Sequence, residues 1–219
     1  MDTVRTQQLV EYLKQHGGPA GGGVTRLKRV YRPMICPFDT LLNLIPNQQR
    51  ILDIGCGIGT FLQLLAEYRA PQSLAGIETD ASLLETSRIV LSQSRLSEPA
   101  RLEPYDGVNL PEWIREYKYV FLVDVFHHIP LSHHGPFLSG LFDRLQSGTT
   151  LIIKDMNADQ RFWVLFNKMH DLLISRTATH ERGMTQLRET LNHMGFCIRK
   201  VITQRLYVYP HFTIVCEKP

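Results

Sequence analysis

The sequence has few cysteines and no long apolar run. The four cysteines are Cys36, Cys56, Cys197 and Cys216. No two of them form a C-x-x-C pair, so neither a metal site nor a disulfide framework is indicated. The most apolar window, at residues 120–126, contains Asp124 and is much too short to span a bilayer. Since the first residues also lack the apolar core of a secretory signal, we expect a cytoplasmic protein without a transmembrane segment.

The sequence also lacks a strong charge of one sign. Lys and Arg number 24 against 21 Asp and Glu, which gives a formal net charge of +3 over 219 residues. Domains that bind nucleic acid concentrate far more positive charge on one face, so no nucleic-acid partner is expected. The hydrophobic fraction of 43% is ordinary for a globular protein. The length suits one α/β domain better than two.

Glycine and proline divide the N-terminal part of the chain. Apolar residues at helical spacing predict a first helix, and the glycines of residues 17–23 then prevent a helix from continuing. We predict a hinge or lid at that position. Residues 1–23 are therefore expected to form an N-terminal helix with a flexible segment, and residues 24–219 a single domain. Pro33 and Pro37 are expected to break the structure before the domain core.

From position 50 onward, apolar strand-like runs alternate with helical periodicities. Strands are expected at residues 51–54, 73–77, 101–104, 119–123, 149–153, 197–203 and 212–217. Asp80 is predicted to cap the helix after the second strand. An insertion with apolar residues at helical spacing, 162–173, precedes a helix at 187–194. This order of elements predicts a doubly wound α/β sheet.

A glycine turn follows the first predicted strand, which ends in Asp53. The glycines of the turn are Gly55, Gly57 and Gly59. A turn of this kind lets the backbone approach a ligand without interference from Cβ atoms. Glu78 falls at the end of the second strand, where a carboxylate can accept hydrogen bonds from both hydroxyls of a ribose. Together these residues predict a site for a nucleoside-containing cofactor.

The spacing G-x-G-x-G differs from the dinucleotide fingerprint, because position 60 is Thr60 where that fingerprint has its third glycine. Residues 51–60 resemble the first motif of class I S-adenosylmethionine (SAM)-dependent methyltransferases, and residues 76–80, Gly-Ile-Glu-Thr-Asp, resemble their second. Residues 105–106, Tyr-Asp, and residues 124–130, Asp-Val-Phe-His-His-Ile-Pro, are also similar to segments of this family.

The resemblance implies a fold, a cofactor and a set of binding residues. The implied fold is a doubly wound, mostly parallel seven-stranded sheet with helices on both faces and an antiparallel seventh strand. SAM is the implied cofactor, with Asp53 and the glycine turn along its methionine part, Glu78 at its ribose and Asp106 at its adenine. The implied cofactor-binding residues are Asp53, Gly55, Cys56, Gly57, Gly59, Glu78, Thr79, Asp106, Gly107, Asp124 and Val125.

Methyl transfer to a protic acceptor needs alignment of the reactants and a base. Histidine has the side chain whose ordinary pKa best matches neutral pH, so His127 and His128 are the candidate catalytic residues. Asp124 and Asp155 are further candidates for the base. The alternative interpretation is that the two histidines only satisfy backbone groups of their loop.

The acceptor is expected to be a small molecule. Residues 154–157, 167–171 and 207–211 are similar to small bacterial methyltransferases associated with lipid-like or polyketide-like products, which suggests a hydrophobic or lipid-like acceptor. The aromatic and methionine side chains that could line its pocket, or belong to the core, are Phe162, Trp163, Phe166 and Met169. The alternative functions are an NAD(P)-linked oxidoreductase and a catalytically silent SAM-binding protein. No oligomeric state follows from the sequence.

Overall fold

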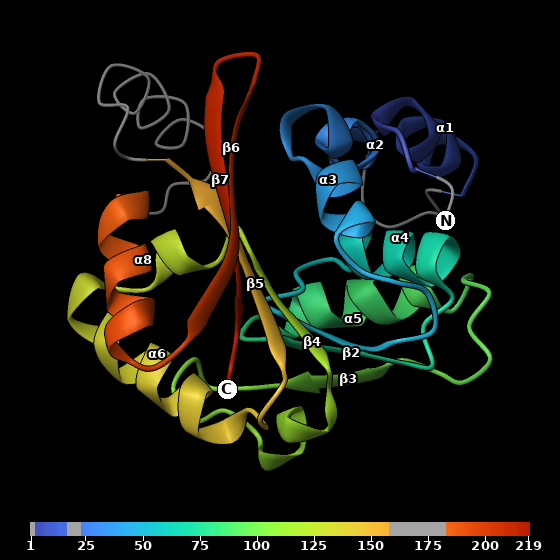
Figure 1. Cartoon of the computed structure of the whole chain (residues 1–219). Coiled ribbons are helices and arrows are strands. Elements are labelled where there is room, and N and C mark those ends of the chain that lie inside the picture. The colour runs from blue at the N-terminus through green and yellow to red at the C-terminus, as the bar shows by residue number, and fades with distance from the viewer. Residues whose placement is uncertain (1–2, 17–22, 158–182) are drawn as a thin grey trace. The chain divides into compact units, whose positions relative to one another are not determined.

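The computed structural model describes residues 3–16, 23–157 and 183–219 (Figure 1). It divides the chain into two compact units, Met1–Gly107 and Val108–Pro219. The predicted helix in residues 162–173, with its candidate pocket residues, lies outside the described residues. Residues 17–22 of the predicted hinge also lie outside them, so the hinge and the single domain over residues 24–219 stay predictions.

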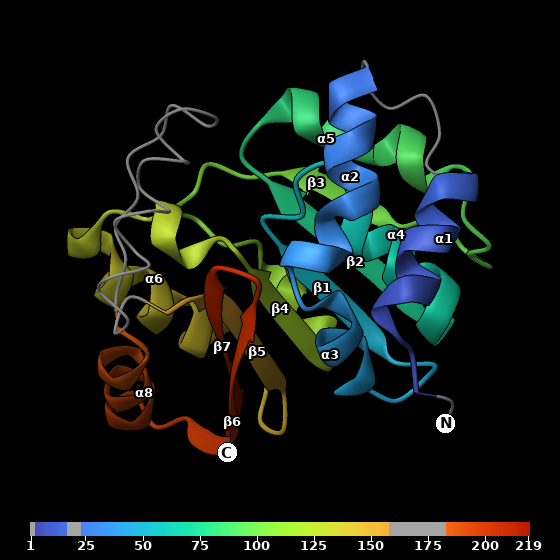
Figure 2. The same cartoon turned by 90° about the horizontal axis from the view of Figure 1, so that it is seen from above.

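The first unit contains three strands and five helices among its described residues. Its elements are α1 (Thr6–His16), α2 (Gly23–Ile35), α3 (Phe38–Asn43), β1 (Arg50–Ile54), α4 (Thr60–Arg69), β2 (Ser73–Glu78), α5 (Ala81–Leu91) and β3 (Arg101–Pro104). The strands pair in parallel, β1 with β2 and β2 with β3. Helices α4 and α5 pack along these strands, and α1 and α2 pack on each other (Figure 2).

The second unit contains the remaining four strands. Its described elements are the short 3-10 helix η1 (Glu112–Glu116), β4 (Tyr119–Val123), the 3-10 turn η2 (Phe126–His128), α6 (Leu131–Arg144), β5 (Thr150–Met156), α8 (Met184–His193), β6 (Cys197–Leu206) and β7 (Tyr209–Glu217). Strand β4 pairs with β5 in parallel, whereas β7 is antiparallel to both β5 and β6. Helices α6 and α8 lie on the same side of these strands in both views (Figures 1 and 2).

The strands follow the order β3-β2-β1-β4-β5-β7-β6 in a seven-stranded sheet. The order, with its parallel strands and its antiparallel β7, confirms the predicted doubly wound α/β fold. The central strands consist almost entirely of buried apolar side chains, as parallel strands covered by helices require. Among the described residues, none of the helices has the length and apolarity that crossing a bilayer would need.

A local sequence signal identified the start of α5 correctly. The Asp80 carboxylate accepts hydrogen bonds from the backbone N–H groups of Ser82 and Leu83, so it is the predicted cap of α5. The predicted break at Pro33 is wrong, because α2 continues through Pro33 to Ile35. Proline has no backbone N–H, so α2 lacks one helical hydrogen bond at Pro33. Because α2 ends two residues later, at Ile35, this missing hydrogen bond affects only the last turn.

Gly76, in the middle of β2, lies where the strand passes closest to the turn after β1. A Cβ atom on Gly76 would lie 2.8 Å from Cys56 Sγ and 2.8 Å from Leu62 Cδ1. Both side chains are buried, Leu62 fully. Only glycine therefore lets β2, α4 and the turn pack at this separation.

We expect Gly76→Ala to lower the free energy of unfolding by about 1–3 kcal/mol, because the added methyl group overpacks a closed part of the core. Urea unfolding followed by circular dichroism measures the change. Gly140→Ala is the matched control, because a Cβ at Gly140 in α6 meets nothing within 4 Å and should leave stability unchanged or raise it. Equal stability of Gly76→Ala and the wild type would contradict this packing.

Candidate active site

The glycine turn after β1 adopts a conformation that side chains disfavour. Gly55, Gly57 and Gly59 have φ angles of 76°, 54° and 75°, all in the left-handed region. The backbone N–H of Gly55 donates to the carbonyl oxygen of Ile77 at 2.8 Å, which fastens the turn to β2. A Cβ on Gly59 would lie 2.3 Å from Ser87 Oγ. The close approach of Ser87 therefore requires glycine at position 59.

Glu78, the last residue of β2, holds its carboxylate against the same turn. Its Oε2 accepts a hydrogen bond from the Gly57 backbone N–H at 2.8 Å. Its Oε1 accepts hydrogen bonds from the backbone N–H groups of Thr79 and Asp80, at 2.7 and 3.2 Å. Glu78 is only 9% exposed, so the chain's own backbone fixes the carboxylate.

Asp53 is a buried carboxylate beside the turn. It is 2% exposed, and its Oδ1 has no hydrogen-bond partner among the described residues. Burial raises the pKa of Asp53 well above its usual range, the negative charge of Glu78 raises it further, and Arg32 acts in the opposite direction. A positively charged group bound here would supply the missing partner. This orphaned oxygen is the feature by which the site fits a cofactor with an ammonium group.

Cys56, between the first two glycines, is a buried thiol. Burial raises its pKa, and the charges of Asp53 and Glu78 raise it further. The thiol therefore stays protonated at neutral pH and is no nucleophile. Its role in the turn is to fill space against β2.

The end of β3 completes this part of the site. The Tyr105 backbone N–H donates to the Glu78 carbonyl oxygen at 3.1 Å. Gly107 has a φ of 83°, and a Cβ there would lie 3.5 Å from the Thr79 methyl group. Burial raises the pKa of the Tyr105 hydroxyl to about 12, and the charges of Glu78 and Asp106 act in the same direction. The structure thus brings the predicted residues of three strand ends together within the first unit.

A second group of polar side chains lies at the ends of β4 and β5, within the second unit. The parallel register pairs Val123 with Lys154, so the next residues, Asp124 just after β4 and Asp155 near the end of β5, lie side by side. Asp124 has a φ of 56°, an uncommon value for a residue with a side chain. The backbone then enters the turn η2, which carries His127 and His128.

His127 is held by Asp155. Its Nδ1 lies 2.6 Å from Asp155 Oδ1, and its backbone N–H donates to Asp155 Oδ2 at 3.0 Å. Burial lowers the pKa of His127, but the charge and hydrogen bond of Asp155, with the charge of Asp124, outweigh burial and leave the pKa raised. His128 is exposed, with its ring centroid 4.0 Å from that of His127.

Lys154 is almost completely buried, with 1% of its side chain exposed, and its Nζ lies 2.5 Å from Asp124 Oδ1. Possible metal-binding atoms of Asp124, His127 and Asp155 all lie within 4.8 Å of one another. The Lys154 ammonium already places a positive charge on Asp124, where a metal ion would otherwise neutralise it. The absence of a metal therefore stays the prediction from the sequence.

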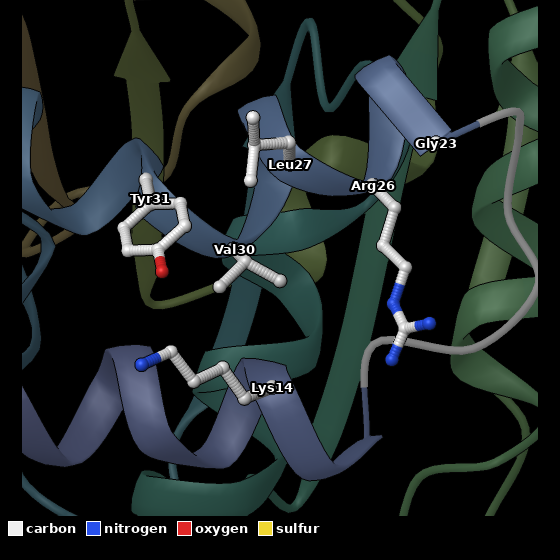
Figure 3. A pocket seen from close by; sticks show the side chains of 6 residues that line it. All are labelled: Lys14, Gly23, Arg26, Leu27, Val30 and Tyr31. Atoms are coloured by element: carbon white, nitrogen blue, oxygen red, sulfur yellow. The ribbon is translucent and has the colours of Figure 1, made fainter.

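A cavity of about 240 Å³ lies between α1 and α2 (Figure 3). It is lined by Lys14, Gly23, Arg26, Leu27, Val30 and Tyr31. The Lys14 ammonium lies 5.5 Å from the centre of the Tyr31 ring. None of the lining residues belongs to the glycine turn or to the strand ends, so this cavity is separate from the predicted site residues.

Comparison with known proteins places the chain in a family. A family model described as a methyltransferase domain matches residues 26–201. The chain belongs to this methyltransferase family. The match agrees with the resemblance carried by the glycine turn, and SAM is the cofactor. No curated protein matches the sequence.

Solved methyltransferases share the fold at low sequence identity. The magnesium protoporphyrin IX methyltransferase of Synechocystis, with bound S-adenosylhomocysteine, has a TM-score of 0.70 and 15% identity over 98% of this chain and 100% of that chain. A structure of a complex between the Haloferax volcanii Trm112 methyltransferase activator and a putative methyltransferase has a TM-score of 0.73 and 14% identity over 99% of each chain. A SAM-dependent methyltransferase of Methanosarcina mazei has a TM-score of 0.67 and 17% identity, covering 82% of this chain and 96% of that chain.

Sequence reasoning missed two features of the methyltransferase. It named Asp155 as a candidate base and identified no partner for Asp155 or Lys154, whereas the structure pairs Asp155 with His127 and Lys154 with Asp124. The signal was available, because both residues lie near the end of a strand parallel to β4. Their pairing with particular residues depends on side-chain directions that spacing does not reveal.

The free energy of unfolding should fall by different amounts when each member of the Lys154–Asp124 pair is replaced. We expect Asp124→Asn to lower the free energy of unfolding by about 3 kcal/mol, because the buried Lys154 ammonium loses its counter-charge. Lys154→Met should cost less, since methionine fills the volume and Asp124 reaches water. Urea unfolding of both variants measures the order, with Glu112→Gln in an exposed ion pair as a control of little effect. The reverse order would contradict the assignment of Lys154 as the buried partner.

Proposed function

We propose that this methyltransferase transfers the methyl group of SAM to a small-molecule acceptor through a protic oxygen or nitrogen, and that the acceptor is hydrophobic or lipid-like. The observation that carries the cofactor placement is the pair of buried carboxylates, Asp53 and Glu78, at the ends of adjacent parallel strands. The acceptor class is supported by the resemblance of residues 154–157 and 207–211 to enzymes with lipid-like products.

Each carboxylate suits a different part of the cofactor. Glu78, whose oxygens are fixed by backbone N–H groups, accepts hydrogen bonds from the ribose hydroxyls in this proposal. Asp53, with its unpartnered oxygen, pairs with the ammonium of the methionine part. The positive φ angles of the glycines leave room for the backbone N–H groups to approach the cofactor. The turn of Asp106 and Gly107 lies at the adenine.

His127 is the proposed base. Bound SAM supplies a methyl group on a positively charged sulfur, which is a good leaving group, so the chain mainly needs to orient the acceptor and remove its proton. His127 is the histidine of η2 with a fixed orientation and a raised pKa. Asp124 and Val125 precede it on the same turn and are proposed, as in the family resemblance, to contact the cofactor.

We also propose that the enzyme acts in the cytoplasm. All four cysteines are free thiols, and three of them are buried. Such thiols suit a reducing compartment. Detection of the native protein in a cytosolic fraction would test this.

Glu78→Gln should weaken SAM binding roughly 10- to 100-fold, because a charge-assisted hydrogen bond to the ribose is lost. Calorimetric titration of the purified variant measures the dissociation constant. Glu85→Gln is the matched control, since Glu85 lies on the exposed face of α5 with a side chain that is 69% exposed, and it should bind SAM as the wild type does. Unchanged affinity in Glu78→Gln would refute the placement of the ribose.

The same titration separates the alternative functions. NADH binding in place of SAM would support the oxidoreductase alternative, which the family match already disfavours. SAM binding without transfer of a labelled methyl group to any extract component would support the catalytically silent alternative. Transfer to an organic-extractable product supports the proposed acceptor class, and transfer only to water-soluble products would overturn it.

A further inference from the structure

We propose that α2 docks the methyltransferase on an anionic lipid bilayer, with an exposed apolar stripe in the headgroup layer and the surrounding cations against the lipid phosphates. The apolar stripe consists of Leu27, Tyr31 and Ile35. The inference goes beyond the proposed function, because surface docking does not depend on which group accepts the methyl. The residues concerned all belong to the first unit.

The positive charge of the chain is concentrated around α2. Residues 12–38 contain five Lys and Arg and no Asp or Glu. The rest of the chain has 19 Lys and Arg against 21 Asp and Glu. The formal net charge of +3 therefore combines a segment of +5 with a remainder that is slightly acidic. An anionic surface attracts such a segment and orients the protein with α2 toward it.

The apolar stripe runs along the exposed face of α2. Leu27 is 60% exposed, Tyr31 40% and Ile35 42%. The three residues are spaced by four positions, so they follow one another along one line of the helix surface. Single exposed apolar side chains are ordinary. A line of three beside cations is instead typical of a helix that lies in a membrane interface.

Cations border the apolar stripe on both sides. Lys28 and Arg32, both exposed, each follow a stripe residue by one position, so they form a row along one edge. On the other side, Lys14 of α1 and Arg26 of α2 line the cavity between the two helices, which two stripe residues also line (Figure 3). Long basic side chains cover apolar surface with their stems and reach headgroup phosphates with their charged ends.

The opposite face of α2 is packed against the first unit. Val30 is 5% exposed and Arg29 2%. The Arg29 guanidinium donates a hydrogen bond to the side chain of Gln63 on α4. The helix is therefore already formed and anchored, so docking does not require an ordering of the backbone that would weaken binding.

Two other partners match this surface less well. A nucleic acid presents phosphates to the cations but leaves the apolar stripe in water. A second copy of the chain would cover the stripe but would bring two segments of +5 together. A bilayer of anionic lipids satisfies both features, because its phosphates lie directly beside apolar acyl chains.

The C-terminal half of α2 also lies near the proposed cofactor turn. The positive charge of Arg32 acts against the raised pKa of Asp53, and a charge has this effect only at short range. Docking through α2 would thus bring the turn after β1 close to the bilayer, where a lipid-like acceptor resides.

Cosedimentation of the full-length protein with lipid vesicles tests the proposal without an acceptor. The wild type should bind vesicles of phosphatidylcholine with phosphatidylglycerol, should bind phosphatidylcholine alone far more weakly, and should be released by high salt. Arg26→Gln combined with Lys28→Gln should weaken binding roughly 25-fold, which is about fivefold for each cation. Leu27→Gln should weaken it roughly 10-fold. The matched controls are Arg188→Gln on α8 and Ile89→Gln on α5, both at exposed positions, and they should bind as the wild type does.

Absence of wild-type binding to the anionic vesicles would overturn the proposal, and this result does not depend on the folding of any variant. Vesicle binding that the α2 variants leave unchanged would also overturn it. So would a dimer that Leu27→Gln dissociates in sedimentation velocity, or RNA that binds more tightly than the vesicles and is lost with the cations. The α2 variants should keep the SAM affinity of the wild type. Failure of the wild type to bind SAM would refute the proposed function and leave the vesicle result standing.

Discussion

The site depends on one electrostatic constraint, the placement of two carboxylates at the ends of adjacent parallel strands. Asp53 pairs with Gly76 across β1 and β2, two residues before Glu78. The backbone N–H groups of the turn stabilise Glu78, whereas Asp53 keeps an oxygen without a partner. Burial and the neighbouring charge therefore raise the pKa of Asp53. We propose that a positively charged cofactor relieves this imbalance.

The second unit also has two carboxylates at the ends of adjacent parallel strands, but their charges are compensated differently. Parallel β4 and β5 place Asp124 and Asp155 side by side, but here the chain provides its own partners, the Lys154 ammonium for Asp124 and the imidazole of His127 for Asp155. In the proposed function, the first unit receives a positive charge from the cofactor. In the same proposal, the second unit accepts the proton of the methyl acceptor at His127, whose imbalance of charge the Asp155 carboxylate compensates.

Much of the fold could be predicted because its signals are local. The glycine turn, the Asp80 cap and the apolar strands each depend on a few consecutive residues, and the structure agrees with them. Pro33 was misread, since a proline near the end of a helix disturbs only the last turn. The partners of His127 and Lys154 could not be predicted, because they depend on side-chain directions across two strands. Residues 158–182, which carry the candidate pocket side chains, lie outside the described residues.

The most direct test of the central claim is calorimetric titration of SAM over a series of pH values, with the wild type and Asp53→Asn. Since the pKa of Asp53 is raised, lowering the pH should neutralise it and weaken SAM binding in the wild type, while the affinity of Asp53→Asn should be lower and less dependent on pH. Equal affinities with equal pH dependence would contradict the pairing of Asp53 with the cofactor's ammonium group.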